Sequence, residues 1–350
     1  MTTLNAEGGL AERRSALGAA CVRSLRDDHL QLIVLPTEQC NFRCTYCYED
    51  FTVGRMAPAV VEGVKRLVDR RLDGLRDLRI SWFGGEPLLA IGVIEEISGH
   101  VAEMARRTAT TYVGDMTTNA YLLDSAMVRR LAALGIRSFQ ISLDGPKHLH
   151  DLTRIRRDGR GSFDRLWENL LAIRHGDAPV QVLLRIHLTP ENLHAMPEFL
   201  RRIRKDFLGD RRFSVHLKPV EHLGGENDAT TAVLSTRERE RILADLQSVL
   251  GVENSSADLS PYVCYAARPN SLVIRANGTV GKCTVSLTDP ANNVGRLTED
   301  GTLEIDNDRL HPWLRGWQSG DWDTLGCPAD GFTLGEPLLQ IGLPPNRSAE

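Results

Sequence analysis

Residues 36–51 read PTEQCNFRCTYCYEDF, and three cysteines fall within eight residues of this stretch. Cys40, Cys44 and Cys47 have the spacing C-x3-C-x2-C. A structural zinc site needs a fourth ligand, and the nearest histidines along the chain are His29 and His100. Three thiolates on one compact loop suit a 4Fe–4S cluster instead, in which the fourth iron is left without a protein ligand. Such an open iron is a place where a substrate or a cofactor can chelate.

Outward from this loop, short β-branched runs alternate with amphipathic helical runs between about residues 30 and 250. The patterns predict six strands, at 31–35, 78–83, 111–117, 138–143, 180–188 and 213–218. They predict helices at 59–72, 124–134 and 163–174, and a last one that begins with a capping box of Ser235 and Glu238. Repeated strand–helix units predict a parallel sheet covered by helices.

Two observations favour a partial (β/α)6 TIM-like barrel over an open doubly wound sheet. The segments GGEP (84–87), TTN (117–119) and SLDG (142–145) each follow the end of a strand, where β/α barrels build their sites. The later strands also alternate between apolar and polar residues, whereas a sheet covered on both faces is nearly continuously apolar. We therefore expect a polar face that lines a lumen. An antiparallel sheet with one wet face is the alternative, and the intervening helices argue against it.

Composition and charge restrict the partners of the chain. Its 350 residues are 42% hydrophobic and 25% charged, which is typical of a globular enzyme. The formal net charge of −4 offers no cationic field for nucleic acid and no attraction to an anionic membrane surface. No apolar run approaches the roughly 18 residues of a membrane helix, and the N-terminus lacks the apolar core of a secretory signal. A cytoplasmic location with reduced cysteines is therefore expected.

The cysteine triplet with Tyr46 before its last cysteine, followed by GGEP, TTN and SLDG in that order, closely resembles the radical S-adenosylmethionine (SAM) superfamily. The resemblance covers about residues 30 to 330. It implies that Cys40, Cys44 and Cys47 hold a 4Fe–4S cluster and that SAM chelates the open iron through its amino and carboxylate groups. One electron then cleaves SAM to a 5′-deoxyadenosyl radical, which abstracts a hydrogen atom from the substrate.

The same resemblance implies a SAM pocket at the strand ends. Gly84 and Gly85 would let backbone carbonyls approach the methionine ammonium, and Glu86 would add a negative partner. The other candidates are Ser142 and Asp144 for the ribose hydroxyls, Thr117 and Asn119 for the methionyl or ribose end, Arg154 and Arg185 for the carboxylate, and Tyr46 beside the adenine. Taken singly, these segments also fit a turn, a loop ending, a helix N-cap region or a solvated surface. Their order at successive strand ends favours the pocket.

Three more cysteines lie in the last quarter of the chain. Cys264 and Cys283, with Gly278 between them, resemble the opening signature of the SPASM and twitch extensions, which carry auxiliary iron–sulfur clusters, and Cys327 would add a third thiolate. The four closely spaced cysteines of a full SPASM domain are missing, so we expect one auxiliary cluster, completed by a non-cysteine ligand or left with an open iron. The alternatives are small buried side chains or a thiol that donates a hydrogen atom. Cys21 is interpreted as incidental.

The expected organisation is an N-terminal helical extension (1–29), the barrel (30–250), a SPASM/twitch-like domain (251–335) and a disordered tail (336–350). Residues 252–262, VENSSADLSPY, are typical of a linker, and Asn277 with Gly278 predicts a β-hairpin turn. The segment before the cysteine triplet is shorter than a leader-binding domain of usual size. A separate leader-binding protein could take its place.

The substrate is less constrained. His187, His216 and Lys218 on the polar face are candidates for binding or deprotonating it, and hydrogen bonding inside the rim is the competing interpretation. The resemblance favours crosslinking or oxidation of a ribosomally made peptide in natural-product biosynthesis, with a flavodoxin- or ferredoxin-type electron donor. The alternatives are an epimerase or dehydrogenase acting on a sugar, nucleoside or aminoglycoside, and, more remotely, a non-catalytic iron–sulfur redox protein.

Overall fold

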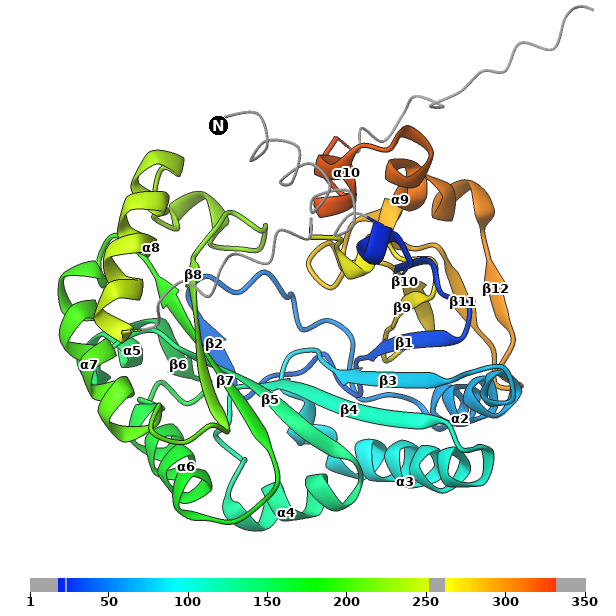
Figure 1. The fold of residues 1–350 in the computed structure, drawn as a ribbon, viewed down its shortest axis with the longest axis horizontal. Helices are drawn as coiled ribbons and strands as arrows, with labels where there is room; N and C mark the ends of the chain where they lie inside the picture. Colours follow the sequence, from blue (N-terminus) through cyan, green and yellow to red (C-terminus); the bar gives the residue numbers. More distant parts are fainter. Residues whose placement is uncertain (1–17, 23, 252–261, 332–350) are drawn as a thin grey trace, which may run out of the picture.

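One curved sheet organises the molecule (Figure 1). The computed structural model describes residues 18–22, 24–251 and 262–331. Within the sheet, six parallel strands follow one another in the order β1-β3-β4-β5-β7-β8. They are β1 (His29–Val34), β3 (Asp77–Trp82), β4 (Thr111–Thr118), β5 (Ile136–Leu143), β7 (Gln181–Leu188) and β8 (Phe213–Pro219). The predicted partial (β/α)6 barrel is confirmed.

Helices cover the outer side of this sheet in Figure 1. They are α2 (Pro58–Leu72), α3 (Ile91–Thr108), α4 (Ser125–Ala133), α5 (Lys147–Thr153), α6 (Phe163–His175), α7 (Met196–Asp206) and α8 (Thr236–Leu250). In α2 the predicted apolar stripe is buried, and α8 begins with the predicted capping box of Ser235 and Glu238. Among the described residues, no helix is long and apolar enough to span a membrane.

The two faces of the later strands differ as their alternation predicts. Phe139, Ile141 and Leu143 of β5 are buried in the main core beneath the helices. Arg185 of β7 and Lys218 of β8 face the other side and line a cavity there. Polar side chains of β7 and β8 therefore line a lumen, as predicted. In a closed barrel, by contrast, stacked apolar side chains would fill the interior.

A short ribbon inside the curve of the sheet was not predicted. Strand β2 (Phe42–Cys44) lies within the cysteine loop and pairs antiparallel with β6 (Arg154–Arg156). The register places Cys44 opposite Arg154. Neither strand exceeds three residues, which is too short for a periodic signal, and their partners are far apart in the chain. The ribbon ties the cysteine loop to the segment that follows α5.

The C-terminal extension continues the same sheet. Strand β9 (Ser271–Ile274) pairs parallel with β1, and β10 (Thr279–Gly281), β11 (Gly295–Leu297) and β12 (Leu303–Ile305) add antiparallel strands. The predicted hairpin is confirmed between β9 and β10, where Gly278 has a φ of 84°. Helices α9 (Asn307–Ser319) and α10 (Trp322–Gly326) follow. The expected tail and all but Tyr262 of the expected linker lie outside the described residues.

Residues 18–22 are helical, and residues 1–17 lie outside the described part of the chain, so the expected N-terminal helical extension stays a prediction.

Candidate functional site

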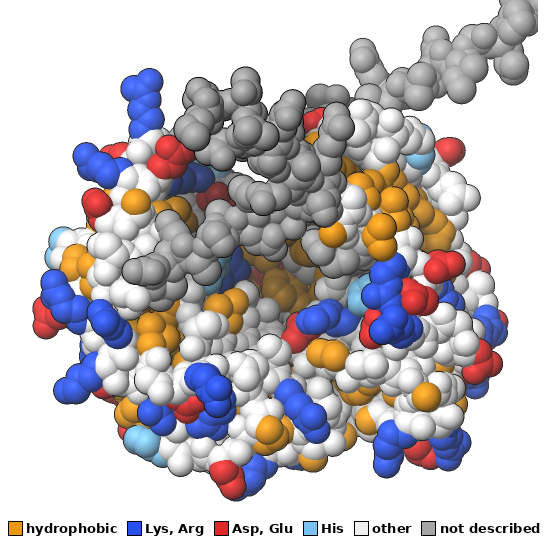
Figure 2. Space-filling view, viewed as in Figure 1, with side chains coloured by type: hydrophobic (Ala, Val, Ile, Leu, Met, Phe, Trp, Pro, Cys, Tyr) orange, Lys and Arg blue, Asp and Glu red, His pale blue; other side chains and the backbone are white. Residues whose placement is uncertain are grey.

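A cavity of about 160 Å³ opens where the parallel strands end. Cys40, Cys44 and Cys47 all line it. The predicted residues that share this lining are Tyr46, Gly84, Gly85, Thr117, Asn119, Ser142, Arg154, Arg185, His187 and Lys218. The face shown in Figure 2 is hollowed near its middle. The structure thus brings together most of the side chains that the sequence placed at strand ends, as parallel strands require.

The two glycines of GGEP let the cysteine loop pack against the end of β3. A Cβ atom on Gly85 would lie 2.6 Å from the carbonyl oxygen of Gln39, and one on Gly84 would collide with that of Thr37. Gly84 also has a φ of 105°, which favours glycine. The Glu86 amide then donates to the Gln39 carbonyl at 3.0 Å. The structure shows these glycines packed closely against the cysteine loop. The predicted approach of their backbone carbonyls to the methionine ammonium stays a prediction.

Glu86 lies behind the cavity wall. It is fully buried, and its carboxylate accepts hydrogen bonds from the Thr118 hydroxyl at 2.8 Å and from the backbone amides of Asn119 at 2.7 Å and Leu88 at 3.0 Å. Burial raises the pKa of this carboxyl, and these donors counteract the rise. In this arrangement Glu86 shapes the end of β4, and its predicted contact with an ammonium group stays a prediction.

Asn119 connects β4 to the cysteine loop. Its Nδ2 donates to Asn41 Oδ1 at 2.7 Å and lies 3.9 Å from Cys40 Sγ, which also accepts the Phe42 amide at 3.3 Å. Burial raises the pKa of all three thiols of the loop, that of Cys47 to about 12. Deprotonating these thiols therefore calls for strong positive charge beside the sulfur atoms, which bound iron supplies.

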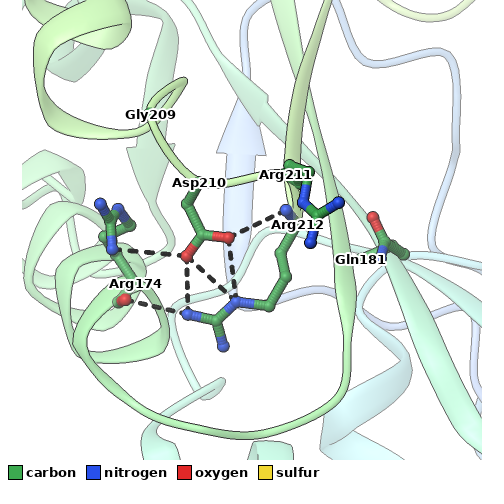
Figure 3. Close-up of a pocket in the computed structure, with 6 residues that line it drawn as sticks. All are labelled: Arg174, Gln181, Gly209, Asp210, Arg211 and Arg212. Atoms are coloured by element: carbon green, nitrogen blue, oxygen red, sulfur yellow. Dashed lines mark hydrogen bonds and ion pairs between the residues drawn. The ribbon is translucent and has the colours of Figure 1, made fainter.

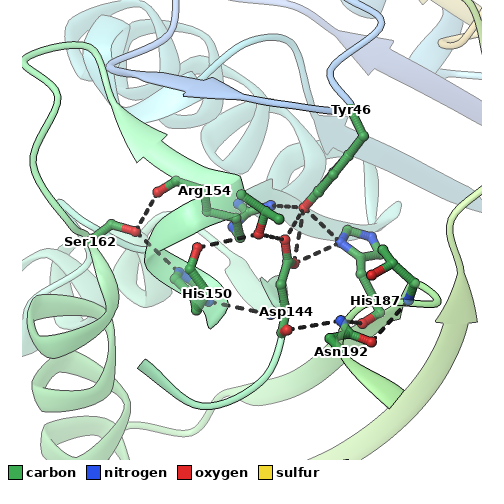
Figure 4. Close-up of polar contacts among 9 residues, drawn as sticks. Tyr46, Asp144, His150, Arg154, Ser162, His187 and Asn192 are labelled. Carbon is green, nitrogen blue, oxygen red and sulfur yellow. Dashed lines mark hydrogen bonds and ion pairs between the residues drawn. The ribbon is translucent and has the colours of Figure 1, made fainter. Parts of the chain in front are cut away.

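Tyr46 is the centre of a polar network beneath the cysteine loop (Figure 4). Its hydroxyl donates to Asp144 Oδ2 at 2.8 Å, accepts from Arg154 Nη1 at 2.9 Å and lies 2.9 Å from His187 Nδ1. The Thr153 hydroxyl also donates to Asp144. Four predicted site residues therefore contact one another, and they join the cysteine loop to β5, β6 and β7.

Asp144 is committed to this network. Although burial raises its pKa, the hydrogen bond from His187 and the charges of His187 and Arg154 hold it well below the usual range. Its carboxylate faces a neighbouring pocket and lies outside the lining of the cysteine cavity. Asn192 and His150, which the sequence did not single out, complete the network through the backbone of residue 144. The predicted role of Asp144 at a ribose remains a prediction.

Two guanidinium groups face the cavity with donors to spare. The Nε atoms of Arg154 and Arg185 are buried and have no hydrogen-bond partner. Lys218, by contrast, forms an ion pair with Glu221. His216 is exposed and lies outside the cavity lining, unlike His187. A buried donor without a partner is costly, so a carboxylate from a ligand fits this side of the cavity.

Comparison with known proteins agrees with this geometry. The model of the radical SAM superfamily matches residues 34–203. The chain belongs to the radical SAM superfamily. A 4Fe–4S cluster and SAM are the cofactors of this family. The residues of the cavity fit both cofactors: three thiols lie on one loop, and the buried Nε atoms of Arg154 and Arg185, in the same lining, have no partner and could bind a carboxylate.

Relatives and solved structures divide between two chemistries. The GTP 3′,8-cyclase of Bradyrhizobium diazoefficiens is 27% identical over 305 residues, covering 85% of this chain and 81% of the relative. The structure of anSMEcpe with bound AdoMet and the Kp18Cys peptide has a TM-score of 0.63 at 17% identity and covers 85% of this chain and 88% of that one. SuiB of Streptococcus suis, bound to the precursor peptide SuiA, has a TM-score of 0.53 at 17% identity, with 87% and 70% covered. These structural likenesses show that the fold is shared.

In this radical SAM enzyme the other three cysteines come from separate loops of the extension. Cys283 follows β10, Cys327 follows α10, and the Cys264 amide donates to the Leu325 carbonyl at 2.9 Å. Burial raises the pKa of Cys264, and the neighbouring Cys283 adds to the rise. The described residues contain no group of three ligands close enough for a single metal ion. A cubane cluster spreads its thiolates more widely than one ion does. Cys21 lies in the helical segment 18–22, far from either group in the sequence.

Two acidic residues of the cysteine loop escaped the sequence analysis. Glu38 is buried and forms a bidentate ion pair with Arg275, which comes from the β9–β10 turn. Glu49 lines the cavity, and burial raises its pKa to about 8. Its Oε2 is buried without a hydrogen-bond partner. The position of Glu49, directly behind the triplet, was the available signal, although the spacing of the cysteines says nothing about which neighbours face inward.

A second hollow at the other edge of the sheet has a structural explanation (Figure 3). It lies where β7 and β8 begin and is lined by three arginines around Asp210. Asp210 binds Arg212 at 2.8 Å and Arg174 at 3.4 Å, and Arg212 Nη2 donates to the Arg174 carbonyl at 2.9 Å. Asp210 joins Arg174 to Arg212 and so fastens the loop before β8 to the end of α6, although the Nε of Arg174 is buried without a partner. The site of chemistry is at the opposite, cysteine-bearing edge.

Proposed function

We propose that this radical SAM enzyme modifies a ribosomally made peptide, by crosslinking or oxidation, in natural-product biosynthesis. The observation that carries the proposal is the cavity itself, in which the cysteine triplet, the unpartnered Nε atoms of Arg154 and Arg185 and apolar side chains such as Phe83 and Leu223 share one lining. The fold is shared with anSMEcpe and with SuiB, both of which have been solved with a bound peptide.

The roles of the residues follow from their positions. Cys40, Cys44 and Cys47 hold the cluster, and Arg154 and Arg185 bind the SAM carboxylate through their free donors. When bound, the cluster supplies the electron that cleaves SAM into methionine and a 5′-deoxyadenosyl radical, which takes a hydrogen atom from the substrate. The Tyr46 network fixes the loop that carries the cysteines.

His187 and Lys218 are the catalytic candidates that the geometry favours. Both line the cavity, and both already have partners, Asp144 for His187 and Glu221 for Lys218. Their polar atoms are therefore oriented before a substrate arrives, which favours a role in positioning it. His216 has the weaker case because it is exposed outside the cavity.

The extension, with its SPASM/twitch-like cysteines, completes the proposal. Cys264, Cys283 and Cys327 hold one auxiliary iron–sulfur cluster, which accepts an electron from the substrate radical or ligates the substrate. A flavodoxin- or ferredoxin-type protein in the cytoplasm supplies electrons to the enzyme, and a separate protein delivers the leader peptide.

The test begins with anaerobic reconstitution, followed by dithionite, SAM and chromatography for 5′-deoxyadenosine. We then expect candidate precursor peptides encoded near this gene to lose two hydrogens by mass spectrometry. Cleavage of SAM without any change in a peptide would remove the peptide proposal and leave the radical SAM chemistry intact. Deuterium uptake from solvent into a peptide or sugar of unchanged composition would indicate an epimerase instead.

A second candidate is cyclisation of a purine nucleotide. It is favoured by the likeness to GTP 3′,8-cyclase, which extends over 85% of this chain. The same reconstituted enzyme, given GTP in place of peptide, would then form a product that retains the three phosphates. Formation of that product at rates above those seen with any peptide would decide for the second candidate.

A further inference from the structure

Glu49 has a carboxylate oxygen that the chain itself leaves without a partner. The residue lies two positions after Cys47 and lines the cavity. Its Oε2 is buried and accepts no hydrogen bond. A buried charged or polar group without a partner is costly, and native structures keep few of them away from functional sites. The carboxylate is therefore prepared for a group that the protein does not supply.

The cations around the cysteine loop are already committed elsewhere. The guanidinium of Arg275, whose charge acts on Glu49, is held by Glu38 and by the carbonyl of Leu287. Arg43 donates to two backbone carbonyls of its own loop and lies over the Phe51 ring. Lys218 is paired with Glu221. No ion pair joins any of these cations to Glu49 among the described residues, so its Oε2 receives no donor from the protein.

The two arginines of the cavity do not pair with Glu49. Arg154 and Arg185, whose Nε atoms have no partner, come from β6 and β7, and no ion pair joins either of them to Glu49 among the described residues. The charges that act on Glu49 belong to Glu38 and Asp50 of its own loop and to Arg275 of the extension. Aromatic rings of Tyr48 and Phe83 line the same cavity. Aromatic faces attract cations, which adds to the preference set by the carboxylate.

We propose that Glu49 binds a positively charged side chain of the substrate, the ammonium of lysine or the guanidinium of arginine. This inference rests on the proposed function and specifies the substrate as a peptide with a basic residue near the reacting position. A charge-assisted hydrogen bond to Oε2 would satisfy the orphaned oxygen. The arrangement disfavours the phosphates of a nucleoside triphosphate at Glu49, because phosphate oxygens accept hydrogen bonds and would leave Oε2 without a donor.

The test compares two pools of synthetic octapeptides that differ only in one position, lysine in the first pool and acetyl-lysine in the second. Their binding to the reconstituted holoenzyme is measured with SAM present, by equilibrium dialysis under anaerobic conditions. We expect the lysine pool to bind about tenfold more tightly, since acetylation removes the charge and keeps the side-chain stem. Glu49→Gln should reduce this ratio to about one, and Glu49→Asp should retain part of it.

Asp50→Asn is the matched control, because it removes one negative charge from the adjacent, exposed position, whose carboxylate bonds only within its own loop. This control should keep the wild-type ratio. Equal binding of both pools by the wild-type enzyme overturns the inference, as does a ratio that survives Glu49→Gln. A loss of SAM affinity in Glu49→Gln with an unchanged peptide ratio would assign Glu49 to the ammonium of SAM. If Glu49→Gln loses its iron, the inference is still tested by the ratio of lysine-pool to acetyl-lysine-pool binding in Glu49→Asp and in the wild type.

The failure of the proposed function has a different signature. If the lysine pool binds preferentially but no peptide is modified, the charge recognition stands and the assigned reaction is wrong. If GTP binds more tightly than either pool and Glu49→Gln leaves its affinity unchanged, the cavity serves a nucleotide and the inference is overturned.

Discussion

The two cysteine groups of this chain are held in opposite ways. Cys40, Cys44 and Cys47 share one loop, and that loop is gripped by the glycines at the end of β3, by Asn119 and by β6. The cysteines of the extension come from three loops, which tertiary contacts such as the hairpin and the bond from the Cys264 amide to Leu325 bring together. Spacing within one loop is visible in the sequence, whereas the second group depends on tertiary structure. The difference also separates their expected functions, because only the first group lines the cavity.

The largest expected effect comes from removing each group in turn. Changing Cys40, Cys44 and Cys47 to Ala should abolish 5′-deoxyadenosine formation, because no thiolate remains to hold the iron that SAM chelates. Changing Cys264, Cys283 and Cys327 to Ala should leave SAM cleavage in place while the iron content falls by about four per chain. Anaerobic chromatography and iron analysis measure both. Equal loss of SAM cleavage in the two variants would contradict the division of roles.

The next prediction tests how tightly the loop of Cys40, Cys44 and Cys47 is packed against the end of β3. Gly85→Ala places a methyl group 2.6 Å from the Gln39 carbonyl, so the loop that carries the cysteines must shift. Displacing the support of a metal ligand typically costs about tenfold or more in metal affinity. Gly54→Ala is the control in the same region, because a Cβ there meets nothing within 4 Å. Iron retention during chelator challenge measures the difference, and similar retention in both variants would disprove the tight packing.

The contrast between the groups explains what the sequence could and could not foretell. The strands were predicted to within about two residues because their alternation is local, and the barrel triplet followed from spacing alone. The pairing of β2 with β6 was missed because it joins short segments far apart in the chain. Helix α9 was missed because polar residues and Pro312 interrupt its pattern. Helix α3 was also missed, although Val93, Ile94, Ile97 and Val101 have the spacing of a buried helical face.

Side-chain direction was the other limit. Motif order placed Glu86 and Asp144 at the strand ends, and the alternation of β8 placed His216 on the polar face, but neither signal fixes what a side chain contacts. Glu86 turns towards the backbone of β4, Asp144 towards Tyr46, and His216 towards solvent. Which way each points depends on partners such as Thr118 and Thr153, which come from other elements. That information arises only when the sheet is assembled.

A smaller effect is expected where the two regions meet. Arg275→Ala removes the partner of buried Glu38 and breaks a contact between the barrel and the extension. Because the Glu38 charge is then uncompensated, the variant should lose about 3–5 kcal/mol of unfolding free energy. Arg70 also bridges the barrel to the extension, through Asp300, but both side chains of that pair are more than half exposed. Arg70→Ala should therefore cost about 0–1 kcal/mol. Urea unfolding compares them, and equal costs would show that the Glu38 pair is not important to the junction.

The smallest expected effect concerns His150, a buried neutral histidine near the cysteine loop of the barrel. The described part of the extension has no matching group, because its His311 is exposed. Nδ1 of His150 accepts the Asp144 amide, and its Nε2 lies 3.1 Å from the Ser162 hydroxyl, which in turn donates to the Arg154 carbonyl. A protonated ring could not accept that amide. Burial accordingly lowers the pKa of His150 to about 4, although Asp144 counteracts the shift.

Because the unfolded chain holds this proton more tightly than the folded chain does, the contribution of His150 is fully present above pH 6.5 and shrinks as the pH falls towards 4. Between pH 7 and pH 5 the wild type should lose about 2 kcal/mol of unfolding free energy more than His150→Gln does, since glutamine does not titrate. Urea unfolding of both proteins at the two pH values measures this difference, and other titrating groups cancel in it. An identical loss in both would mean that the ring is charged in the folded state, and the hydrogen-bond chain from Asp144 to Arg154 would then need a different donor order.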